Sequence, residues 1–432
     1  MSEDRRRNAK KGEEEHPMMS TPNMPYVCAV QFRLYTSGRR EAELKPVFQH
    51  EFQRIKPVQF HIQSTFATDI TIQLLNSRIR FNGKNRWDIQ VHNTKLIERM
   101  ASDTDLGFGE AYMEGWWDCD DLEEFSYRWA SGPNGSYMPF TDRFRYRLQH
   151  LINRQNESLS NIVNICHYDL GNDLFTAFLD KTMNYTCAYW RNADNLDQAQ
   201  IDKMELTARK LKLKPGMKVL DLGCGFGSMA KYLAENYQVE VVGYTNSTQH
   251  VNYARENCAG LSVEIRQQDY RKAEGLYDRV YSIGFLEAVG VKNYRTYFEV
   301  AGRCLKDDGI MLTHSIALMH PTQPPMNRWT DTYIFPNGWL PWDTDFITYS
   351  RGLFIVEDLH NFGYDYYKTL MAWHQNFEKN WPKLEQKYGQ KFYRMWRYYL
   401  LCAAGIFRAR KYQLLQVVYS KMGLEHGYES ER

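Results

Sequence analysis

Short apolar runs alternate with amphipathic stretches through the second half of the chain. Each run has the length of a strand rather than that of a helix. The runs are 218–222, 239–243, 261–265, 277–283 and 309–314, and helical stretches lie near 229–235, 249–258 and 293–305. Strands that alternate with helices predict an α/β fold with a parallel, doubly wound sheet.

A series of glycines follows the first of these strands. Residues 218–222 lead directly into Gly223, Gly225 and Gly227, and a helix is expected from residue 229. A strand, a glycine turn and a helix open a nucleotide-binding βαβ unit, because glycine lets the backbone turn sharply and approach a ligand closely. A purely structural turn is the alternative.

The carboxylate before this turn discriminates between nucleotide ligands. A dinucleotide site needs Gly-x-Gly-x-x-Gly, but the chain has Asp221 before the first glycine and Ser228 where the third dinucleotide glycine would fall. Asp221 would repel a pyrophosphate, whereas it would suit an ammonium group. The pattern therefore favours S-adenosylmethionine over NAD as the cofactor.

Candidate ligand-binding residues follow several of the predicted strands. They are Gly223, Thr245, Asp269, Glu287 and His314. In an open α/β sheet, ligands bind beyond the carboxyl ends of the strands. We therefore expect these residues to surround one site.

Composition divides the chain into four parts. They are a disordered tail over 1–25, an N-terminal domain over 26–135, a linker with a basic amphipathic helix over 136–160, and a catalytic domain over 161–432 with a helical cap at about 318–410. Within the N-terminal domain, residues 87–91 predict a strand, and the glycines and aromatics of 107–118 predict a packing corner between the two domains. The basic helix suits anionic lipid headgroups or, equally well, a solvated surface.

Charge and cysteine content exclude several classes of function. The net charge is +2, so composition gives no reason to expect nucleic acid as a partner. The 8 cysteines show no spacing typical of a zinc site, so we expect free thiols, a reducing cytoplasmic compartment and no metal. No apolar run reaches about eighteen residues, so we expect a protein that is soluble or peripheral to a membrane.

Ten stretches of the chain are similar to motifs of one family. They are 107–118, 167–175, 185–190, 211–217, 219–227, 268–270, 289–294, 333–338, 360–363 and 407–410. Through them, residues 75 to 425 resemble the cyclopropane fatty acid synthase family. The resemblance implies a Rossmann-like fold of the class I S-adenosylmethionine-dependent methyltransferases, with a helical cap and a small N-terminal domain.

This resemblance also implies a reaction. The sulfonium methyl of S-adenosylmethionine is transferred to the cis double bond of an unsaturated phospholipid acyl chain, and bound bicarbonate removes the proton so that the carbocation closes to a cyclopropane. An alkene is a poor nucleophile, so such a site must supply alignment, a dry apolar wall and a base. The family further implies a homodimer, and the substrate implies transient contact with a membrane surface.

Matching motifs carry the family's site residues onto this chain. The implied bicarbonate ligands are Cys187, Glu287, His314, Tyr399 and the backbone amide of Ile316. The implied cofactor-binding residues are Tyr185, Thr186, Asp221, Gly223, Gly225, Thr245, Asn246, His250, Gln268 and Asp269, with Asp221 at the amino-acid end and Asp269 at the adenine amino group. The aromatic residues expected to face the carbocation are Tyr168, Tyr333, Trp373 and Phe377.

Two positions depart from the family pattern. The family reads Phe-Glu-His-Val-Gly at 286–290, so Ala288 replaces a histidine beside Glu287, and His250 replaces a glutamine near the adenosine. Alanine cannot donate a hydrogen bond that would orient Glu287. Besides a working synthase, two alternatives therefore stay open: a related lipid methyltransferase that gives a methyl-branched chain, and a homologue with weak or no turnover.

Overall fold

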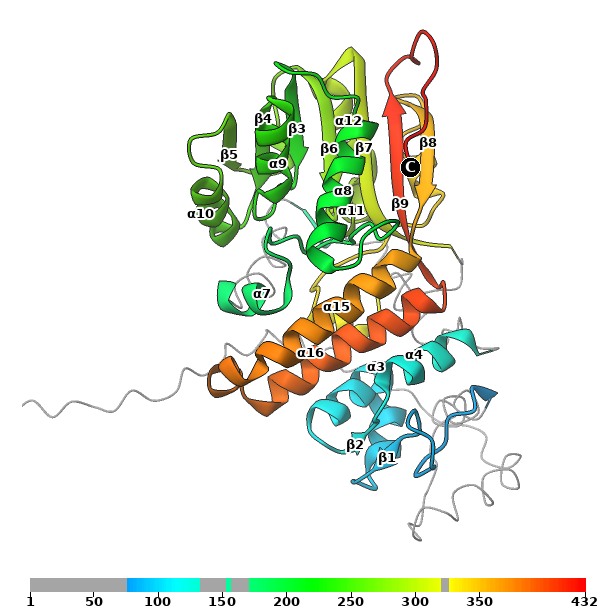
Figure 1. Cartoon of the computed structure of the whole chain (residues 1–432). Coiled ribbons are helices and arrows are strands. Elements are labelled where there is room, and N and C mark those ends of the chain that lie inside the picture. Colours follow the sequence, from blue (N-terminus) through cyan, green and yellow to red (C-terminus); the bar gives the residue numbers. More distant parts are fainter. Residues whose placement is uncertain (1–75, 133–152, 157–170, 320–325) are drawn as a thin grey trace, which may run out of the picture. The chain divides into compact units, whose positions relative to one another are not determined.

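The computed structural model describes residues 76–132, 153–156, 171–319 and 326–432 (Figure 1). The predicted disordered tail and most of the predicted basic helix fall outside these ranges, as does Tyr168. Within the described ranges, no helix combines the length and the apolar character needed to cross a membrane.

A seven-stranded sheet forms the centre of the catalytic part, in the order β5-β4-β3-β6-β7-β9-β8. Its strands are β3 (Lys218–Leu222), β4 (Glu240–Thr245), β5 (Val263–Gln267), β6 (Tyr277–Ile283), β7 (Leu305–Leu318), β8 (Ile355–Asn361) and β9 (Tyr412–Ser420). The first five are parallel, and β9 is antiparallel to both β7 and β8. The five strands predicted from the sequence and their parallel arrangement are confirmed.

Two strands depart from the sequence prediction. Residues 318–410 were expected to form a helical cap, but β8 interrupts it, and β9 follows it. β8 lies at the edge of the sheet, and four of its residues are polar: Glu357, Asp358, His360 and Asn361. Such a strand lacks the apolar run by which buried parallel strands are recognised.

Helices cover the sheet between the strands. They are α8 (Leu196–Lys210), α9 (Ser228–Tyr237), α10 (Thr248–Asn257), α11 (Leu286–Val289) and α12 (Tyr294–Cys304). The helices expected at 229–235, 249–258 and 293–305 are thus confirmed to within about two residues, the usual scatter of helix ends. Met204 and Ala208 of α8 pack against Val219, Leu312 and Val418 of the sheet.

The cap itself is largely helical and aromatic. Its helices are α13 (Arg328–Tyr333), α14 (Asp345–Thr348), α15 (Tyr364–Asn380) and α16 (Glu385–Arg408), and the last two pack against each other (Figure 1). The short helix α7 (Asn172–Phe178) packs on α15. Trp373, Phe377 and Trp396 are fully buried in the shared cluster. The dense aromatic content of this segment therefore builds a hydrophobic core of its own.

The described part of the N-terminal region consists of α3 (Leu96–Met113), α4 (Leu122–Ser131) and the two-stranded pair β1 (Gln90–Val91) and β2 (Trp117–Asp118). The strand expected at 87–91 is therefore shorter than predicted. α4 packs closely on α16, since a Cβ at Gly405 would lie 2.6 Å from the carbonyl oxygen of Glu123.

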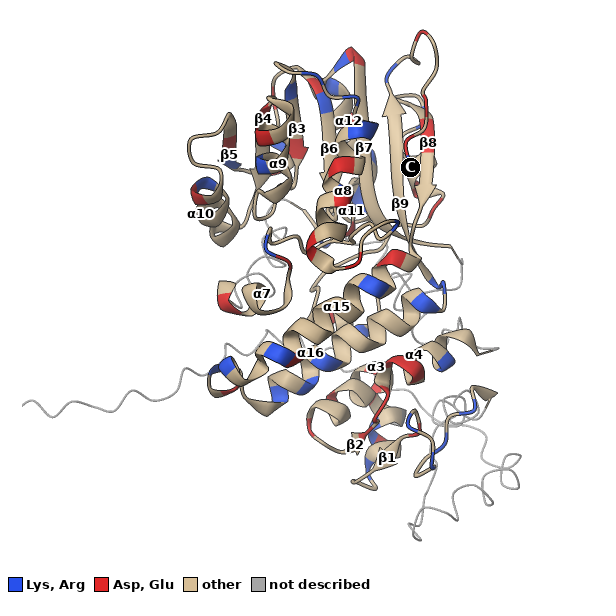
Figure 2. Ribbon diagram, viewed as in Figure 1, with Lys and Arg blue, Asp and Glu red and all other residues tan. Residues whose placement is uncertain are grey.

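Opposite charges line the contact between α16 and the N-terminal region (Figure 2). Arg394 pairs with Asp118 at 2.7 Å, and Arg408 pairs with Glu124 at 2.7 Å. Partly exposed pairs of this kind contribute little each, so packing rather than charge carries most of the stabilisation.

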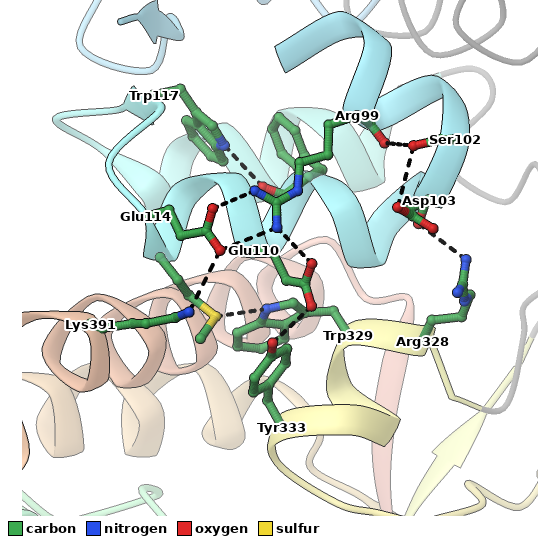
Figure 3. Close-up of polar contacts among 12 residues, drawn as sticks. Arg99, Ser102, Asp103, Glu110, Glu114, Trp117, Arg328, Trp329, Tyr333 and Lys391 are labelled. Atoms are coloured by element: carbon green, nitrogen blue, oxygen red, sulfur yellow. Dashed lines mark hydrogen bonds and ion pairs between the residues drawn. The ribbon is translucent and has the colours of Figure 1, made fainter. Parts of the chain in front are cut away.

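The predicted packing corner at 107–118 contacts α13 of the cap. A Cβ at Gly109 would lie 2.3 Å from Cδ1 of Trp329, so glycine leaves the space that the indole ring fills. Beside it, Tyr333 donates to Glu110 Oε1 at 2.8 Å, and Arg99 holds the other oxygen of Glu110 at 2.8 Å (Figure 3).

Candidate active site

A pocket opens at the carboxyl ends of β3, β4, β5 and β6. All ten residues predicted to bind the cofactor line it: Tyr185, Thr186, Asp221, Gly223, Gly225, Thr245, Asn246, His250, Gln268 and Asp269. They come from the loop before α8, from the ends of β3 and β4 and the turns after β3, β4 and β5, and from α10. The structure thus brings this whole predicted group together in one cavity.

The glycine turn has a conformation that demands glycine. Gly223 has a φ of 105°, and a Cβ there would lie 2.4 Å from Cδ2 of Phe285. The amides of Gly223 and Cys224 both donate to the carbonyl of Tyr244, at 3.1 and 2.9 Å. These bonds tie the turn to the end of β4, so the backbone forms one wall of the pocket.

Asp221 is the buried acid at the base of this wall. Its side chain is 2 % exposed, and its Oδ1 completes no hydrogen bond among the described residues, although the Tyr281 hydroxyl lies near it and partly offsets the effect of burial on its pKa. Burial raises the pKa of Asp221 to about 7. A buried carboxyl group with a spare acceptor fits a cationic ligand group, because the ligand's charge would stabilise the carboxylate.

Asp269 already has strong partners within the protein. Arg271 donates to its two oxygens at 2.7 and 2.8 Å, and Asn246 donates at 3.4 Å. Burial opposes the charge of Asp269, but the bonds from Arg271 outweigh it and hold the pKa of Asp269 below its usual value. Arg271 also lines the pocket, and sequence reasoning missed it.

The two positions that depart from the family pattern both line this pocket. The ring of His250 lies 4.6 Å from that of Phe226, and burial lowers the pKa of His250 to about 3, so the ring is neutral. Ala288 contributes only a methyl group, on α11 next to Glu287.

Glu287 belongs to the second predicted group, the anion ligands, and it is held by β7. Its Oε1 accepts a hydrogen bond from the amide of Ile316 at 2.7 Å. Its Oε2 is buried and has no partner in the described part of the chain. Burial raises the pKa of Glu287 to about 7. The Ile316 amide, predicted to bind the anion, therefore donates to Glu287 in this structure.

His314 lies two residues before Ile316 on the same strand, so the two side chains share a face of the sheet. The side chain is 1 % exposed, and its Nδ1 lies 3.2 Å from Nε2 of Gln416 on β9. Burial first, and then the charges of Lys203 and Lys210, lower the pKa of His314, so it is neutral.

The hydrogen bonds of Gln416 determine which nitrogen of His314 carries the proton. Gln416 Nε2 also lies 3.2 Å from the hydroxyl of Thr207, which donates to the carbonyl of Lys203. An amide donor in this place satisfies both acceptors, whereas the flipped amide would leave its N–H groups without acceptors. His314 Nδ1 therefore accepts, and Nε2 carries the proton. That Nε2 has no partner among the residues described.

Cys187 and Tyr399 complete the second group. Cys187 is fully buried, and burial raises the pKa of its thiol, so it is uncharged. The hydroxyl of Tyr399 lies 2.8 Å from that of Tyr185, which lines the cofactor pocket. Ile316 packs in the hydrophobic clusters of both Cys187 and Tyr399. The second group therefore adjoins the first through Tyr185.

Of the aromatic residues predicted to face the carbocation, one lies beside the pocket and two have other partners. The ring of Trp373 lies 5.2 Å from that of Tyr185, beside the pocket. Phe377 packs on Trp381, and Tyr333 directs its hydroxyl to Glu110 of α3. An aromatic that the sequence analysis did not single out, Phe335, has its ring centre 6.0 Å from that of Tyr399 and 6.4 Å from that of Tyr185.

Metal-binding and disulfide sites are absent from the ranges described. No group of three or more His, Cys, Asp or Glu side chains there could hold a metal ion. The six cysteines in those ranges are free thiols.

The fold is that of a class I S-adenosylmethionine-dependent methyltransferase, as predicted. Its parallel sheet is extended by an antiparallel pair, and the glycine turn and the pocket lie at the carboxyl edge of the sheet. Solved structures agree: a coclaurine N-methyltransferase bound to N-methylheliamine and SAH has a TM-score of 0.61 over 72% of this chain and 98% of its own, at 20% identity. At that identity the likeness concerns the fold.

The chain belongs to the mycolic acid cyclopropane synthetase family, whose sequence profile matches residues 154–417. It is 45% identical, over 83% of its length and 94% of the relative's, to the cyclopropane-fatty-acyl-phospholipid synthase of Escherichia coli (strain K12). A mycolic acid cyclopropane synthase solved with SAH and CTAB is 32% identical, with a TM-score of 0.57 over 61% of this chain and 98% of its own.

Proposed function

We infer that the protein is a cyclopropane-fatty-acyl-phospholipid synthase, which uses S-adenosylmethionine to convert the cis double bond of a phospholipid acyl chain into a cyclopropane. The observation that carries this function is the identity of 45% with the Escherichia coli synthase over 94% of that protein. The pocket supports it, since the residues expected to bind the cofactor all line one cavity.

The cofactor pocket fits S-adenosylmethionine, which when bound supplies an activated methyl group. Gly225 gives the ligand close access to the backbone after β3, because a Cβ there would point into open space. Asp221 offers its unpartnered Oδ1 to the ammonium end. Gln268 and Asn246 present amide groups at the ends of neighbouring strands.

The second group fits bicarbonate, which when bound supplies the base for the departing proton. Two buried polar atoms there have no partner in the described ranges, Oε2 of Glu287 and Nε2 of His314. Nε2–H of His314 would donate to the bound anion, and Glu287 would accept from the hydroxyl of that anion. Because the pKa of Glu287 is raised to about 7, much of this group is uncharged near neutral pH and repels the anion less. The hydroxyl of Tyr399 adds a donor.

Aromatic residues exclude water from the reacting carbons. Trp373 is fully buried beside Tyr185, and Phe335 contacts the rings of both Tyr185 and Tyr399. A dry wall of this kind prevents hydrolysis of a carbocation, and ring faces stabilise it by about 0.5–2 kcal/mol each. The substrate class also leads us to propose a cytoplasmic protein that contacts membranes transiently and acts as a homodimer.

A second function follows from Ala288. A pocket wall that lacks an imidazole could hold the cofactor or the cation differently, which favours a lipid methyltransferase with a methyl-branched product. The same change would also suit a homologue of weak activity.

Mass spectrometry of lipid fatty acids separates these functions. The chain is expressed in a cell that lacks such an activity, with isotope-labelled methionine. A labelled gain of one methylene with loss of the double bond supports the synthase, and Glu287→Ala should abolish it. A labelled methyl branch would instead support the second function. No label in lipid, although the purified protein binds S-adenosylhomocysteine, would refute both.

A further inference from the structure

Lys203 is a buried cation without an ion pair. Its side chain is fully buried on α8, facing the sheet. The ammonium donates to Oδ1 of Asn184 at 3.0 Å and to Oγ1 of Thr186 at 2.8 Å. Lys203 forms no ion pair within the described ranges, and the acid that acts on it most strongly is Asp180. Unpaired buried ammonium groups are rare, because removal from water strongly disfavours their charge.

The loop that Lys203 contacts does not need this charge for its shape. Gln200, one turn earlier on α8, is also fully buried and donates to the carbonyl of Thr186 at 2.9 Å and to that of Asn184 at 3.4 Å. The backbone amide of Asn184 also donates to Oδ1 of Asp180 at 2.9 Å. Gln200 and Asp180 therefore already fix the loop.

The position of Lys203 links both parts of the active site. Thr186 lines the cofactor pocket and directly precedes Cys187 of the second group. One turn further along α8, Thr207 accepts from Gln416, which holds His314. The buried face of α8 thus supports the cofactor loop and the predicted anion ligands together.

The ionisable groups around Lys203 do not neutralise it closely. Asp180, in the loop before α8, is more distant than 4.0 Å and accepts from Thr182 and Asn184, while burial raises its pKa. The thiol of Cys187 and the ring of His314 are uncharged. Lys210, two turns along α8, lies 3.8 Å from Asp358, and burial lowers its pKa to about 7. Burial lowers the pKa of Lys203 to about 8, so it keeps its charge at neutral pH.

We propose that Lys203 supplies the positive charge that holds a planar carboxylate-type anion in the pocket next to Thr186 and Cys187. This inference rests on the proposed function, which brings two such anions to the site: bicarbonate and the α-carboxylate of S-adenosylmethionine. Both are planar, singly charged and rich in acceptor oxygens, and a buried ammonium attracts either.

The test replaces Lys203 by glutamine, which removes the charge and keeps a donor toward the loop. Calorimetry compares the binding of S-adenosylhomocysteine with that of methylthioadenosine, which lacks the amino-acid end, and turnover is titrated with bicarbonate. We expect Lys203→Gln to weaken binding of one anion about tenfold to a hundredfold, with methylthioadenosine unchanged. Weaker S-adenosylhomocysteine binding assigns the α-carboxylate, and a higher bicarbonate requirement assigns bicarbonate.

Wild-type protein provides a second measurement should the variant not fold. Affinity for the assigned anion should fall above about pH 8, as Lys203 loses its proton, while methylthioadenosine binding stays flat. Lys181→Gln is the matched control, because it removes the charge of a lysine that is 88 % exposed and paired with Asp197, and it should leave anion binding intact.

Equal anion affinities in Lys203→Gln and wild type, with no loss above pH 8, would overturn the proposal. If the wild type nevertheless forms labelled cyclopropane lipid, only the role of Lys203 is refuted, and the proposed function stands. Absence of that product from the wild type refutes the function itself.

Discussion

Replacing Gln416 by methionine is expected to release the proton of His314 from Nε2. In the structure, the amide of Gln416 donates to Nδ1 of His314 at 3.2 Å and to Thr207 at 3.2 Å. If Nδ1 of His314 carried the proton instead, its N–H would face the N–H of the Gln416 amide. The lost hydrogen bond costs about 0.5–1.5 kcal/mol, and an unsatisfied buried donor costs about 1–3 kcal/mol.

These costs favour the Nε2–H tautomer by roughly 2–4 kcal/mol, which is a population ratio of roughly 30 to 1,000. Methionine has a similar shape and no N–H, so the preference disappears in Gln416→Met and the ring loses its orienting partner. By analogy with partners that orient metal-binding histidines, turnover should fall about tenfold to a hundredfold. The bicarbonate concentration needed for half-maximal turnover should rise.

Nitrogen NMR of protein labelled in histidine reads the two ring nitrogens of His314 directly. Wild type should show a protonated Nε2 and an unprotonated Nδ1, and Gln416→Met should show a mixture. Thr207→Val is the matched control, because it removes the other acceptor of the Gln416 amide but leaves the contact with His314. An Nδ1–H tautomer in the wild type, or unchanged shifts and bicarbonate response in the methionine variant, would refute the reasoning.

Two further predictions concern stability. His250 is buried with a pKa of about 3, so its contribution to the free energy of unfolding is fully present above pH 6.5 and is lost as the pH falls toward 3. Denaturant unfolding should show that His250→Gln removes about 2 kcal/mol of the loss of stability between pH 6.5 and 5. An unchanged pH dependence of stability in this variant would contradict the prediction. Tyr333→Phe removes the hydrogen bond to Glu110 shown in Figure 3 and should cost about 1.5–3 kcal/mol in unfolding free energy. No loss in Glu110→Gln, which keeps an acceptor but removes the charge, would argue against a contribution from the charge.

The central parallel strands could be read from the sequence because β3 and β6 are mostly buried, whereas the edge strand β5 is marked by alternating apolar and polar residues. β3 and β6 match their predicted bounds, and β4 and β5 lie within two residues of theirs. β8 could not be read in this way, since an edge strand is stabilised by its pairing with β9, which lies about fifty residues further along the chain. Pairing with a strand so distant in sequence leaves no pattern of apolar residues within 355–361 that would reveal the strand.

The cofactor pocket was predictable for a related reason. Gly223, Thr245 and Asp269 lie at strand ends that the topology brings to one edge, whereas Glu287 and His314, expected there by the same argument, do not line the pocket. The other cofactor residues were implied by the family resemblance. Gln416 and Lys203 carry no such signal. A glutamine in a strand and a lysine in an amphipathic helix are usually solvated, and only the packing of α8 on β7 and β9 places both in the interior.

The structure also changes the meaning of Ala288. From the sequence, loss of a histidine beside Glu287 threatens the orientation of that carboxyl group. In the structure, the amide of Ile316 on β7 holds Glu287, whereas Ala288 lines the cofactor pocket. Neighbouring residues on a helix point about 100° apart, so a side chain at 288 reaches a different space from that of Glu287.

Ala288→His should therefore act on the cofactor rather than on the anion. An added imidazole on the pocket wall provides one hydrogen bond, worth about 0.5–1.5 kcal/mol, so affinity for S-adenosylhomocysteine should rise about twofold to tenfold. The bicarbonate response should stay unchanged, because the bond from Ile316 to Glu287 is intact. Ala288→Phe is the control, since it fills the same space without a donor and should weaken binding. An altered bicarbonate response with unchanged cofactor affinity would instead mean that residue 288 orients Glu287.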